Sequence, residues 1–262
     1  MRKIAVSLIA AAGIGLSGAA SAADLGTAPV YRKAPPPEVF TWTGAYIGGY
    51  VGGAFGSNDV TTGVPVNTAG AAVLGGPAAS YKYDSSFIGG YTSGYNWQFA
   101  PNWVLGYEGE TGYLGVKGSA AYANGTSIAQ TRADGLYSVW SARFGYAFDR
   151  SLIYAKGGLA LTTFETGVVD GTAGNHIDTI HRRYALGYAV GGGWEYALDN
   201  KWSVKAEYLY LGFDKDLTTT GNLNGVAGTQ VFTTTGLTGI HTVKAGINYK
   251  FDVLGYFLGA IR

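Results

Sequence analysis

The stretch FIGGYTSGYNWQF, residues 87–99, carries the pattern on which the fold of this chain depends. Its odd-numbered positions are mostly aromatic, and its even-numbered positions from Gly90 to Gln98 are small or polar. Successive side chains of a β-strand point to opposite faces, so a strand here has one aromatic face and one small, polar face. A strand that is apolar outside and polar inside is typical of a membrane-spanning β-barrel.

Seven further segments repeat this alternation, which is the primary signal for a strand. They are residues 42–55, 103–113, 136–148, 152–164, 184–198, 202–211 and 241–251. Beyond Trp42 there is no run of 18 apolar residues, so a membrane-spanning helix is not expected. A soluble sandwich could share the alternation, but it would bury its aromatic residues and would not need charges on the opposite face of nearly every strand.

The connections between these segments fall into two classes. Residues 100–102, 149–150 and 199–200 are tight turns, whereas residues 56–86, 117–135, 165–183 and 212–240 are long and rich in Gly, Thr, Asn and Ala. Short turns on one rim and long loops on the other are the arrangement of an outer-membrane barrel. We therefore predict an all-β fold, an eight-stranded antiparallel transmembrane β-barrel with short periplasmic turns, four long extracellular loops and both chain ends in the periplasm.

The composition agrees with this class and excludes others. The 262 residues include 43 Gly, 20 Tyr, 11 Phe and 6 Trp, but only 18 basic and 17 acidic residues, and no Cys. An average chain has about 7% Gly and about 25% charged residues, so this is not an ordinary cytosolic enzyme. The absence of Cys excludes disulfides and thiolate metal sites. A formal net charge of +1 provides no electrostatic footprint for nucleic acid.

The chain begins with the features of a secretory signal peptide. Met1-Arg2-Lys3 is followed by an apolar run and then by the small-residue site Ala20-Ser21-Ala22. We predict a signal peptide at residues 1–23, a Pro-rich periplasmic tether at 24–40, the outer-membrane barrel at 41–251 and a C-terminal tail at 252–262. The alternative, a buried N-terminal helix, explains these features less completely.

Charged residues recur on the predicted inner face. Several of them fall at similar depth from the short turns, so we expect a lumen charge network made of Glu108, Glu110, Arg143, Lys156, Glu195, Lys205, Glu207, Lys244 and Lys250. Around the turn at 149–150, Arg143 and Lys156 would lie opposite each other, which is destabilising unless a carboxylate reaches between them. An eight-stranded barrel is just wide enough for side chains to fill, so a salt-bridged plug is favoured over a wide channel. A narrow or gated conduit stays open as an alternative.

Three tryptophans lie beside the short turns: Trp97, Trp103 and Trp202. Aromatic residues concentrate where a barrel meets the membrane surface, so we expect these three to be membrane-interface aromatics.

Four sequence stretches also resemble a known family. They are WTGAYIGGYVGGAFG at 42–56, GGWEYAL at 192–198, WSVKAEYLYLGF at 202–213 and VKAGINYKF at 243–251. Together with the signal peptide and tether, they resemble the outer-membrane immunogenic protein family, the opacity-protein-like barrels related in fold to the membrane domain of OmpA. The resemblance implies an eight-stranded barrel, insertion by the barrel-assembly machinery and a surface-exposed antigen often labelled porin-like. Barrels of this kind usually end on the aromatic residue of the last strand, but here Phe251 is followed by eleven further residues.

Motifs for catalysis and metal binding are weak in this chain. The mature sequence contains no G-x-S-x-G, no Gly-Lys-Ser/Thr phosphate loop and no H-E-x-x-H, so we predict no enzyme and no cofactor. His176, Asp178 and His181 could ligate a metal, but solvated loop side chains are the favoured interpretation, and no metal site is predicted. Glu108 and Glu110 resemble an acid/base pair, although positions i and i+2 on a strand simply share a face.

The sequence therefore favours a structural, surface-exposed barrel. A small porin passing ions or small solutes is the alternative function, and an adhesin acting through its loops is a third. The expected partners are outer-membrane lipid and lipopolysaccharide, the barrel-assembly machinery and host or environmental ligands at the loops.

Overall fold

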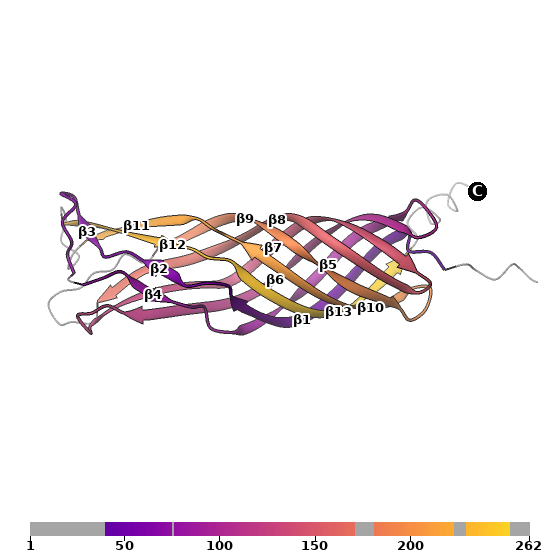
Figure 1. Ribbon diagram of the computed structural model, residues 1–262, viewed down its shortest axis with the longest axis horizontal. Helices are drawn as coiled ribbons and strands as arrows, with labels where there is room; N and C mark the ends of the chain where they lie inside the picture. The colour runs from indigo at the N-terminus through magenta and orange to yellow at the C-terminus, as the bar shows by residue number, and fades with distance from the viewer. Residues whose placement is uncertain (1–39, 75, 171–180, 223–228, 252–262) are drawn as a thin grey trace, which may run out of the picture. The chain divides into compact units, whose positions relative to one another are not determined.

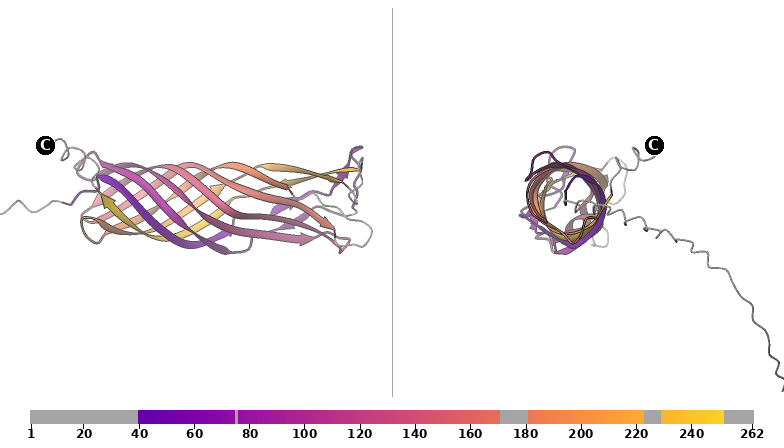
Figure 2. Two further views of the ribbon diagram at one scale, coloured as in Figure 1. Left: turned by 180° about the vertical axis from the view of Figure 1, so that it is seen from behind. Right: turned by 90° about the vertical axis from the view of Figure 1, so that its right-hand side faces the viewer.

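Eight long strands close into a ring in a computed structural model that describes residues 40–74, 76–170, 181–222 and 229–251. The order around the ring is β1-β13-β10-β9-β8-β7-β6-β5 (Figures 1 and 2). The barrel strands are β1 (Gly44–Gly56), β5 (Ser86–Gln98), β6 (Trp103–Ala121), β7 (Ser127–Phe148), β8 (Ser151–Asp170), β9 (His181–Ala197), β10 (Trp202–Gly212) and β13 (Ile240–Phe251). No helix in the described part of the chain is long and apolar enough to cross a membrane.

Every neighbouring pair in the ring is antiparallel, and the first strand closes on the last. β1 pairs with β13 from Ala45 opposite Phe251 to Gly56 opposite Ile240. The predicted alternation is visible in the exposure of the side chains. On β1, Ile47 is 52% exposed on the outer wall, whereas Tyr46 is 4% exposed inside the ring. The period-2 pattern of the sequence thus corresponds to the outside and inside of one closed sheet.

The eight predicted strands are present, but three of them are longer than predicted by at least seven residues, and the predicted loop 165–183 is strand at 165–170 and 181–183. β6, β7 and β8 continue well beyond the apolar zone, so residues 117–121 and 127–135 are strand and the predicted loop 117–135 shrinks to residues 122–126. The Tyr122 N–H donates to the Ser127 oxygen at 2.9 Å and closes this turn. The prediction was wrong here because it required apolar outward residues, whereas Lys117 and Arg132 are exposed polar residues that pair in register between β6 and β7.

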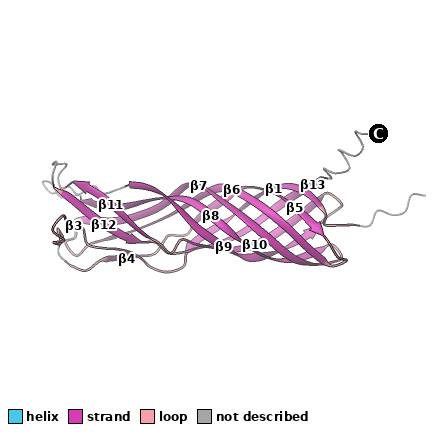
Figure 3. Ribbon diagram, turned by 90° about the horizontal axis from the view of Figure 1, so that it is seen from above, coloured by secondary structure: helices cyan, strands magenta, loops and turns pink. Residues whose placement is uncertain are grey.

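The predicted loops 56–86 and 212–240 contain a second sheet at the same end of the barrel (Figure 3). Its strands are β2 (Val60–Thr62), β3 (Val66–Asn67), β4 (Ala79–Tyr81), β11 (Asp216–Asn222) and β12 (Gln230–Gly236). β12 pairs with β11, β2 and β3, and β2 also pairs with β4. The predicted loops 56–86 and 212–240 are therefore partly ordered β-structure.

Five buried hydroxyl groups join this second sheet to the extended barrel strands. The hydrogen bonds run in a closed circuit, which we call the hydroxyl ring: Thr62–Tyr81 2.8 Å, Tyr81–Thr131 2.8 Å, Thr131–Thr166 2.8 Å, Thr166–Thr235 3.0 Å and Thr235–Thr62 3.2 Å. A hydroxyl can donate once and accept, so all five groups can be satisfied within the circuit. The hydroxyl ring ties β2, β4 and β12 to β7 and β8 across the interior of the long-loop end.

The interior has two different halves. Toward the long loops it is filled by an apolar cluster that includes Ile88, Leu114, Val139, Phe164 and Leu209. Toward the short turns it holds the charged side chains described below. The predicted signal peptide (1–23), the tether as far as residue 39 and the tail (252–262) lie outside the described residues.

Candidate functional site

Eight charged side chains lie inside the barrel at the level of the short-turn half. They are Glu108 and Glu110 on β6, Arg143 on β7, Lys156 on β8, Glu195 on β9, Lys205 and Glu207 on β10, and Lys244 on β13. Each is at most 5% exposed. Strand alternation positions them, because each occupies an inward-facing position of its strand.

Glu108 contacts more cations than the other carboxylates do. Its oxygens lie 2.5 Å from Lys156 Nζ, 3.0 Å from Lys205 Nζ and 3.5 Å from Arg143 Nη1. The Tyr46 hydroxyl donates to Glu108 Oε2 at 2.8 Å. One carboxylate therefore connects cations from three different strands.

Glu110 and Glu207 share two lysines. Lys244 Nζ lies 2.6 Å from Glu110 Oε1 and 2.8 Å from Glu207 Oε1. Lys156 Nζ lies 3.2 Å from Glu110 Oε2 and 3.1 Å from Glu207 Oε1. The Tyr137 hydroxyl donates to Glu110, and the Tyr154 hydroxyl donates to Glu207 at 2.9 Å.

Glu195 lies nearer the short turns and binds Arg143. Arg143 Nη2 donates to Glu195 Oε2 at 2.7 Å, and Glu195 Oε1 accepts from Ser203 Oγ at 2.6 Å and Asn248 Nδ2 at 2.8 Å. The Arg143 guanidinium lies 3.9 Å from the centre of the Tyr154 ring, a cation–π geometry. Each oxygen of this buried carboxylate therefore has at least one donor.

The structure places Arg143 directly opposite Lys156 across the β7–β8 pair. Two cations in that position destabilise a sheet unless counter-charges reach them. Glu108 contacts both of them. The four carboxylates and four cations are therefore arranged so that each charge has a partner of opposite sign within 4 Å.

Glycines on the inner face make room for the tyrosines of this cluster. A Cβ atom built on Gly94 would lie 2.5 Å from the Tyr46 hydroxyl, and one on Gly193 would lie 2.6 Å from the Tyr154 hydroxyl. Real Cβ atoms do not approach other atoms so closely, so these positions require glycine while the tyrosines keep their places. Neither Tyr46 nor Tyr154 was predicted from the sequence as a site residue.

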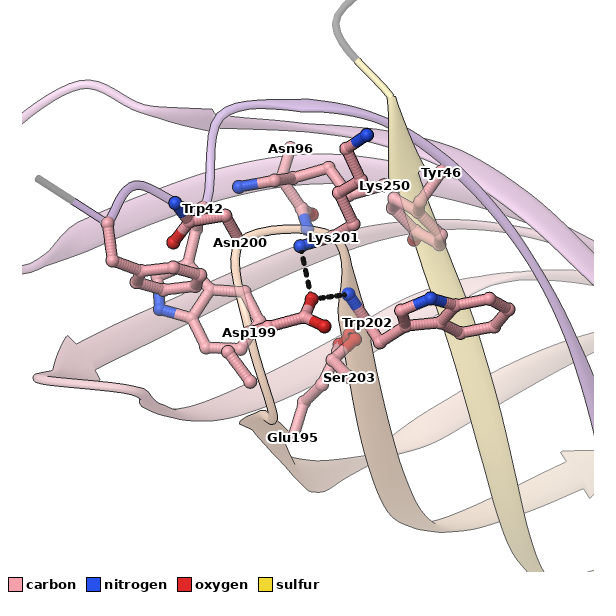
Figure 4. A pocket seen from close by; sticks show the side chains of 12 residues that line it. Trp42, Tyr46, Asn96, Glu195, Asp199, Asn200, Lys201, Trp202, Ser203 and Lys250 are labelled. Carbon is pink, nitrogen blue, oxygen red and sulfur yellow. Dashed lines mark hydrogen bonds between the residues drawn. The ribbon is translucent and has the colours of Figure 1, made fainter. Parts of the chain in front are cut away.

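The mouth of the barrel at the short-turn end is covered by Trp42. This side chain is 4% exposed and belongs to a buried cluster with Val104, Leu152 and Ala197, and the Trp42 backbone N–H donates to Gln98 Oε1 at 2.9 Å. A cavity of about 20 Å³ lies beside it, lined by residues that include Asn96 and Lys250 (Figure 4). That volume holds about one water molecule. Trp42 was predicted from the sequence only as the first residue of a strand, but β1 begins at Gly44.

Lys250, predicted to join the lumen charge network, lies at this mouth. Its Nζ donates to the backbone oxygen of Thr41 and lies 4.7 Å from the centre of the Phe40 ring. Beside it, Asp199 Oδ1 accepts 2.7 Å hydrogen bonds from the backbone N–H groups of Trp202 and Lys201, which hold the pKa of that carboxyl below its ordinary value (Figure 4).

The other residues selected from the sequence fall outside the lumen. Trp97, Trp103 and Trp202 lie on the outer wall close to the short turns and are between 41% and 56% exposed. His181 begins β9, whereas His176 and Asp178 lie outside the described residues.

One group of carboxylates has the spacing of a metal site. Within the described ranges, oxygens of Glu108, Glu110 and Glu207 lie within 4.8 Å of one another. Lys156 binds all three carboxylates and Lys244 binds two of them, so protein ammonium groups supply the positive charge that a metal ion would bring. The donor set therefore fits internal ion pairing better than metal binding.

The outer wall identifies the class of protein. Large apolar side chains such as Val51, Tyr107, Leu136, Leu159 and Ile247 are between 45% and 74% exposed around the ring. From Trp103 to Tyr113, β6 rises about 34 Å along the strand and about 26 Å along the axis at a tilt of about 40°, which matches the apolar band of a transmembrane barrel. Only a closed sheet satisfies its backbone in lipid without an exposed edge. The protein is an integral β-barrel membrane protein.

The chain belongs to the family described as outer membrane protein beta-barrel domain, which matches residues 8–251. It is 34% identical over 262 residues to the 31 kDa outer-membrane immunogenic proteins of Brucella melitensis biotype 1 and Brucella suis biovar 1, covering 96% of this chain and 100% of each relative. The fold is similar to the crystal structure of OprG from Pseudomonas aeruginosa, with a TM-score of 0.53, 15% identity and coverage of 82% of this chain and 100% of OprG. The predicted fold class and family are confirmed, and the protein is one of the bacterial outer membrane.

Proposed function

We propose that this protein is a closed structural barrel that presents its long-loop end to the cell exterior, keeps both termini in the periplasm and conducts no solutes. It uses no cofactor and catalyses no reaction. The observation that carries this proposal is the lumen cluster, in which eight buried charges pair with one another instead of lining an open path.

The other closures of the interior support the same conclusion. Trp42 covers the mouth at the short-turn end, where the neighbouring cavity has room for about one water molecule. At the opposite end, the apolar cluster and the hydroxyl ring fill the interior. A hydrated ion entering from either side would have to displace packed side chains. A channel selective for ions more often has a ring of one charge sign, whereas four carboxylates here balance four cations.

The long-loop end offers a surface suited to contact with the environment. β6, β7 and β8 continue beyond the apolar band and are joined by the second sheet, so this end is folded protein. The Brucella relatives are named immunogenic proteins, which agrees with exposure of this end to a host. The outer-membrane location supports the further proposals that the barrel-assembly machinery inserts the protein and that lipopolysaccharide is its neighbour.

Conductance in a planar bilayer tests the closed lumen. We expect the refolded mature protein, residues 24–262, to be silent, and the variant Glu108→Ala/Glu110→Ala to show discrete current steps because two central partners of the lysines are lost. Glu165→Ala is the matched control, since this carboxylate lies outside the lumen on β8 and pairs with Arg182 at 3.6 Å. Steady current through the unaltered protein would overturn the proposal and make the protein a small porin.

The orientation is tested separately by cysteine labelling, which is clean because the chain contains no Cys. Thr126 lies in the β6–β7 turn and Lys201 in the β9–β10 turn, and both are exposed. A membrane-impermeant maleimide should label Thr126→Cys in intact cells and Lys201→Cys only after the outer membrane is opened. The reverse pattern would contradict the proposed orientation.

A further inference from the structure

Two cations face each other on the outer wall of the long-loop end. Lys117 on β6 and Arg132 on β7 are direct cross-strand partners. Both are exposed, whereas their chain neighbours Val116 and Ala133 are fully buried, so the two charged side chains point away from the barrel interior. Like charges directly opposite each other on adjacent strands are destabilising. The pair therefore favours a ligand that brings negative charge.

The described residues supply no ion-pair partner within 4.0 Å of either cation. The nearby carboxylates have other partners. Glu165, opposite Arg132 on β8, lies 3.6 Å from Arg182, and Asp134 accepts a 2.5 Å hydrogen bond from the Tyr113 hydroxyl. The charge of this cation pair is therefore not neutralised by a direct contact within the described protein.

A polar hollow of about 210 Å³ lies at these two side chains. It is lined by Lys117 and Arg132, by the next outward pair, Ser119 and Gln130, and by Asp84. Two cations, a hydroxyl and an amide can all donate hydrogen bonds to a tetrahedral anion, and Arg and Lys are the side chains best suited to phosphate. Asp84 is the one carboxylate among the lining residues, so the lining keeps a net positive charge.

The hollow lies just beyond the lipid headgroup layer, within reach of it for long side chains. Tyr113 and Leu136 form the last large apolar cross-strand pair of β6 and β7, and the cation pair follows two outward positions later. Four residues rise about 13 Å along a strand and about 10 Å along the axis at a tilt of about 40°. The headgroup layer begins where the apolar band ends and is about 5–8 Å thick, and long basic side chains can reach back toward it.

We propose that this hollow binds a phosphate group of lipopolysaccharide in the outer leaflet. The proposal depends on the orientation proposed above, because only the exterior leaflet carries this lipid. The site holds the lipid at β6 and β7, outside the barrel, and is independent of whether the lumen conducts.

Binding of defined lipid A to the refolded mature protein in zwitterionic detergent tests this site. The probes are bisphosphorylated lipid A, chemically dephosphorylated lipid A and inorganic phosphate, all in EDTA, so that no divalent cation bridges phosphate to Asp84. Dephosphorylated lipid A cannot make the two charge-assisted contacts with Lys117 and Arg132. The unaltered protein should therefore bind the phosphorylated lipid about tenfold or more tightly than the dephosphorylated lipid. Lys117→Gln/Arg132→Gln should reduce this preference to about twofold or less.

The matched control is Arg183→Gln/Lys215→Gln, which removes one Arg and one Lys from exposed positions elsewhere at the same end. It should keep the preference for phosphorylated lipid A. A Lys117→Gln/Arg132→Gln protein that still folds, by its heat-modifiable gel mobility, and retains the full preference would overturn the proposal. Equal affinity for inorganic phosphate would assign the hollow to a free anion instead of a lipid. Maleimide labelling of Lys201→Cys, and not of Thr126→Cys, in intact cells would instead show that the proposed orientation is wrong.

Discussion

Replacing Glu108 with glutamine removes one negative charge from the centre of the lumen and changes the side-chain shape very little. The carboxylate now contacts Lys156 at 2.5 Å, Lys205 at 3.0 Å and Arg143 at 3.5 Å. Lys156 keeps Glu110 and Glu207 as partners, and Arg143 keeps Glu195. Lys205 is affected most, because within the described chain its ion pair is with Glu108 alone.

The expected cost follows from how dry the lumen is. Removing one partner of a buried ion pair costs about 3–5 kcal/mol, because it leaves an uncompensated buried charge. The same change in a solvated pair costs about 0–1 kcal/mol. Glu108 is 1% exposed and Lys205 is 5% exposed, so we expect Glu108→Gln to lower the free energy of unfolding by about 3–5 kcal/mol. The ratio of folded to unfolded protein then falls roughly 150- to 5,000-fold.

Urea unfolding of the barrel in lipid vesicles, followed by tryptophan fluorescence and by gel mobility without boiling, measures this change. With a denaturant slope of about 2.5 kcal/mol per molar, the midpoint should fall by about 1.2–2 M. Glu165→Gln is the control, since its pair with Arg182 is partly exposed and should cost no more than about 1 kcal/mol. The double variant Glu108→Gln/Lys205→Met should recover at least about 1 kcal/mol, because it also removes the unpaired charge.

The result that refutes this reasoning is a Glu108→Gln midpoint equal to that of Glu165→Gln. Such a result would mean that water screens the lumen charges as it screens the partly exposed Glu165–Arg182 pair. The plug would then be a hydrated lining, and the small-porin alternative would gain support from a measurement independent of conductance.

Three further outcomes are expected from other parts of the barrel. Gly94→Val should cost about 1–3 kcal/mol of unfolding free energy, because the new side chain enters the space of the Tyr46 hydroxyl; an unchanged urea midpoint would contradict the close approach. Thr166→Val breaks the hydroxyl ring and leaves a buried hydroxyl without its partner. The substitution should lower the free energy of unfolding by about 1–3 kcal/mol and speed amide exchange in β12. Exchange in β12 that stays slow would argue against the circuit. The hydrogen bond from the Trp202 N–H is the main cause that lowers the pKa of the Asp199 carboxyl. The stabilisation of the β9–β10 turn by this carboxylate should therefore be complete above the unfolded pKa of about 4, and it should be lost as the pH falls through the lower folded pKa. Amide exchange in the turn that does not change at acid pH would disprove this.

The sequence determined the class of fold because strand alternation is a local property. In residues 87–99, the alternation of mostly aromatic with small or polar residues already shows which face lies toward lipid and which toward the interior, and the same holds for the other seven segments of the barrel. The inward positions of Glu108, Arg143 and Lys156 follow from the same alternation. Short turns such as 149–150 also set the opposition of Arg143 and Lys156, because a tight hairpin fixes its register.

The partners within the lumen could not be predicted from alternation. Glu108 and Lys205 are 97 residues apart in the chain, and Lys244 lies 134 residues from Glu110. Those contacts depend on ring closure between β1 and β13 and on the stagger of the strands, which bring distant segments across a narrow interior. The position of Trp42 over the mouth depends on the same closure.

The extension of β6, β7 and β8 was also decided by tertiary structure. Lys117 and Arg132 do not form the apolar outward face of a lipid-facing strand. They nevertheless stay paired across β6 and β7, because the hydroxyl ring gives β7 further partners beyond the apolar band. A single sequence encodes which face each residue prefers, since that choice depends on its own polarity and its immediate neighbours. Which charges meet, and how far a strand continues beyond lipid, depends on groups that only the closed barrel brings together.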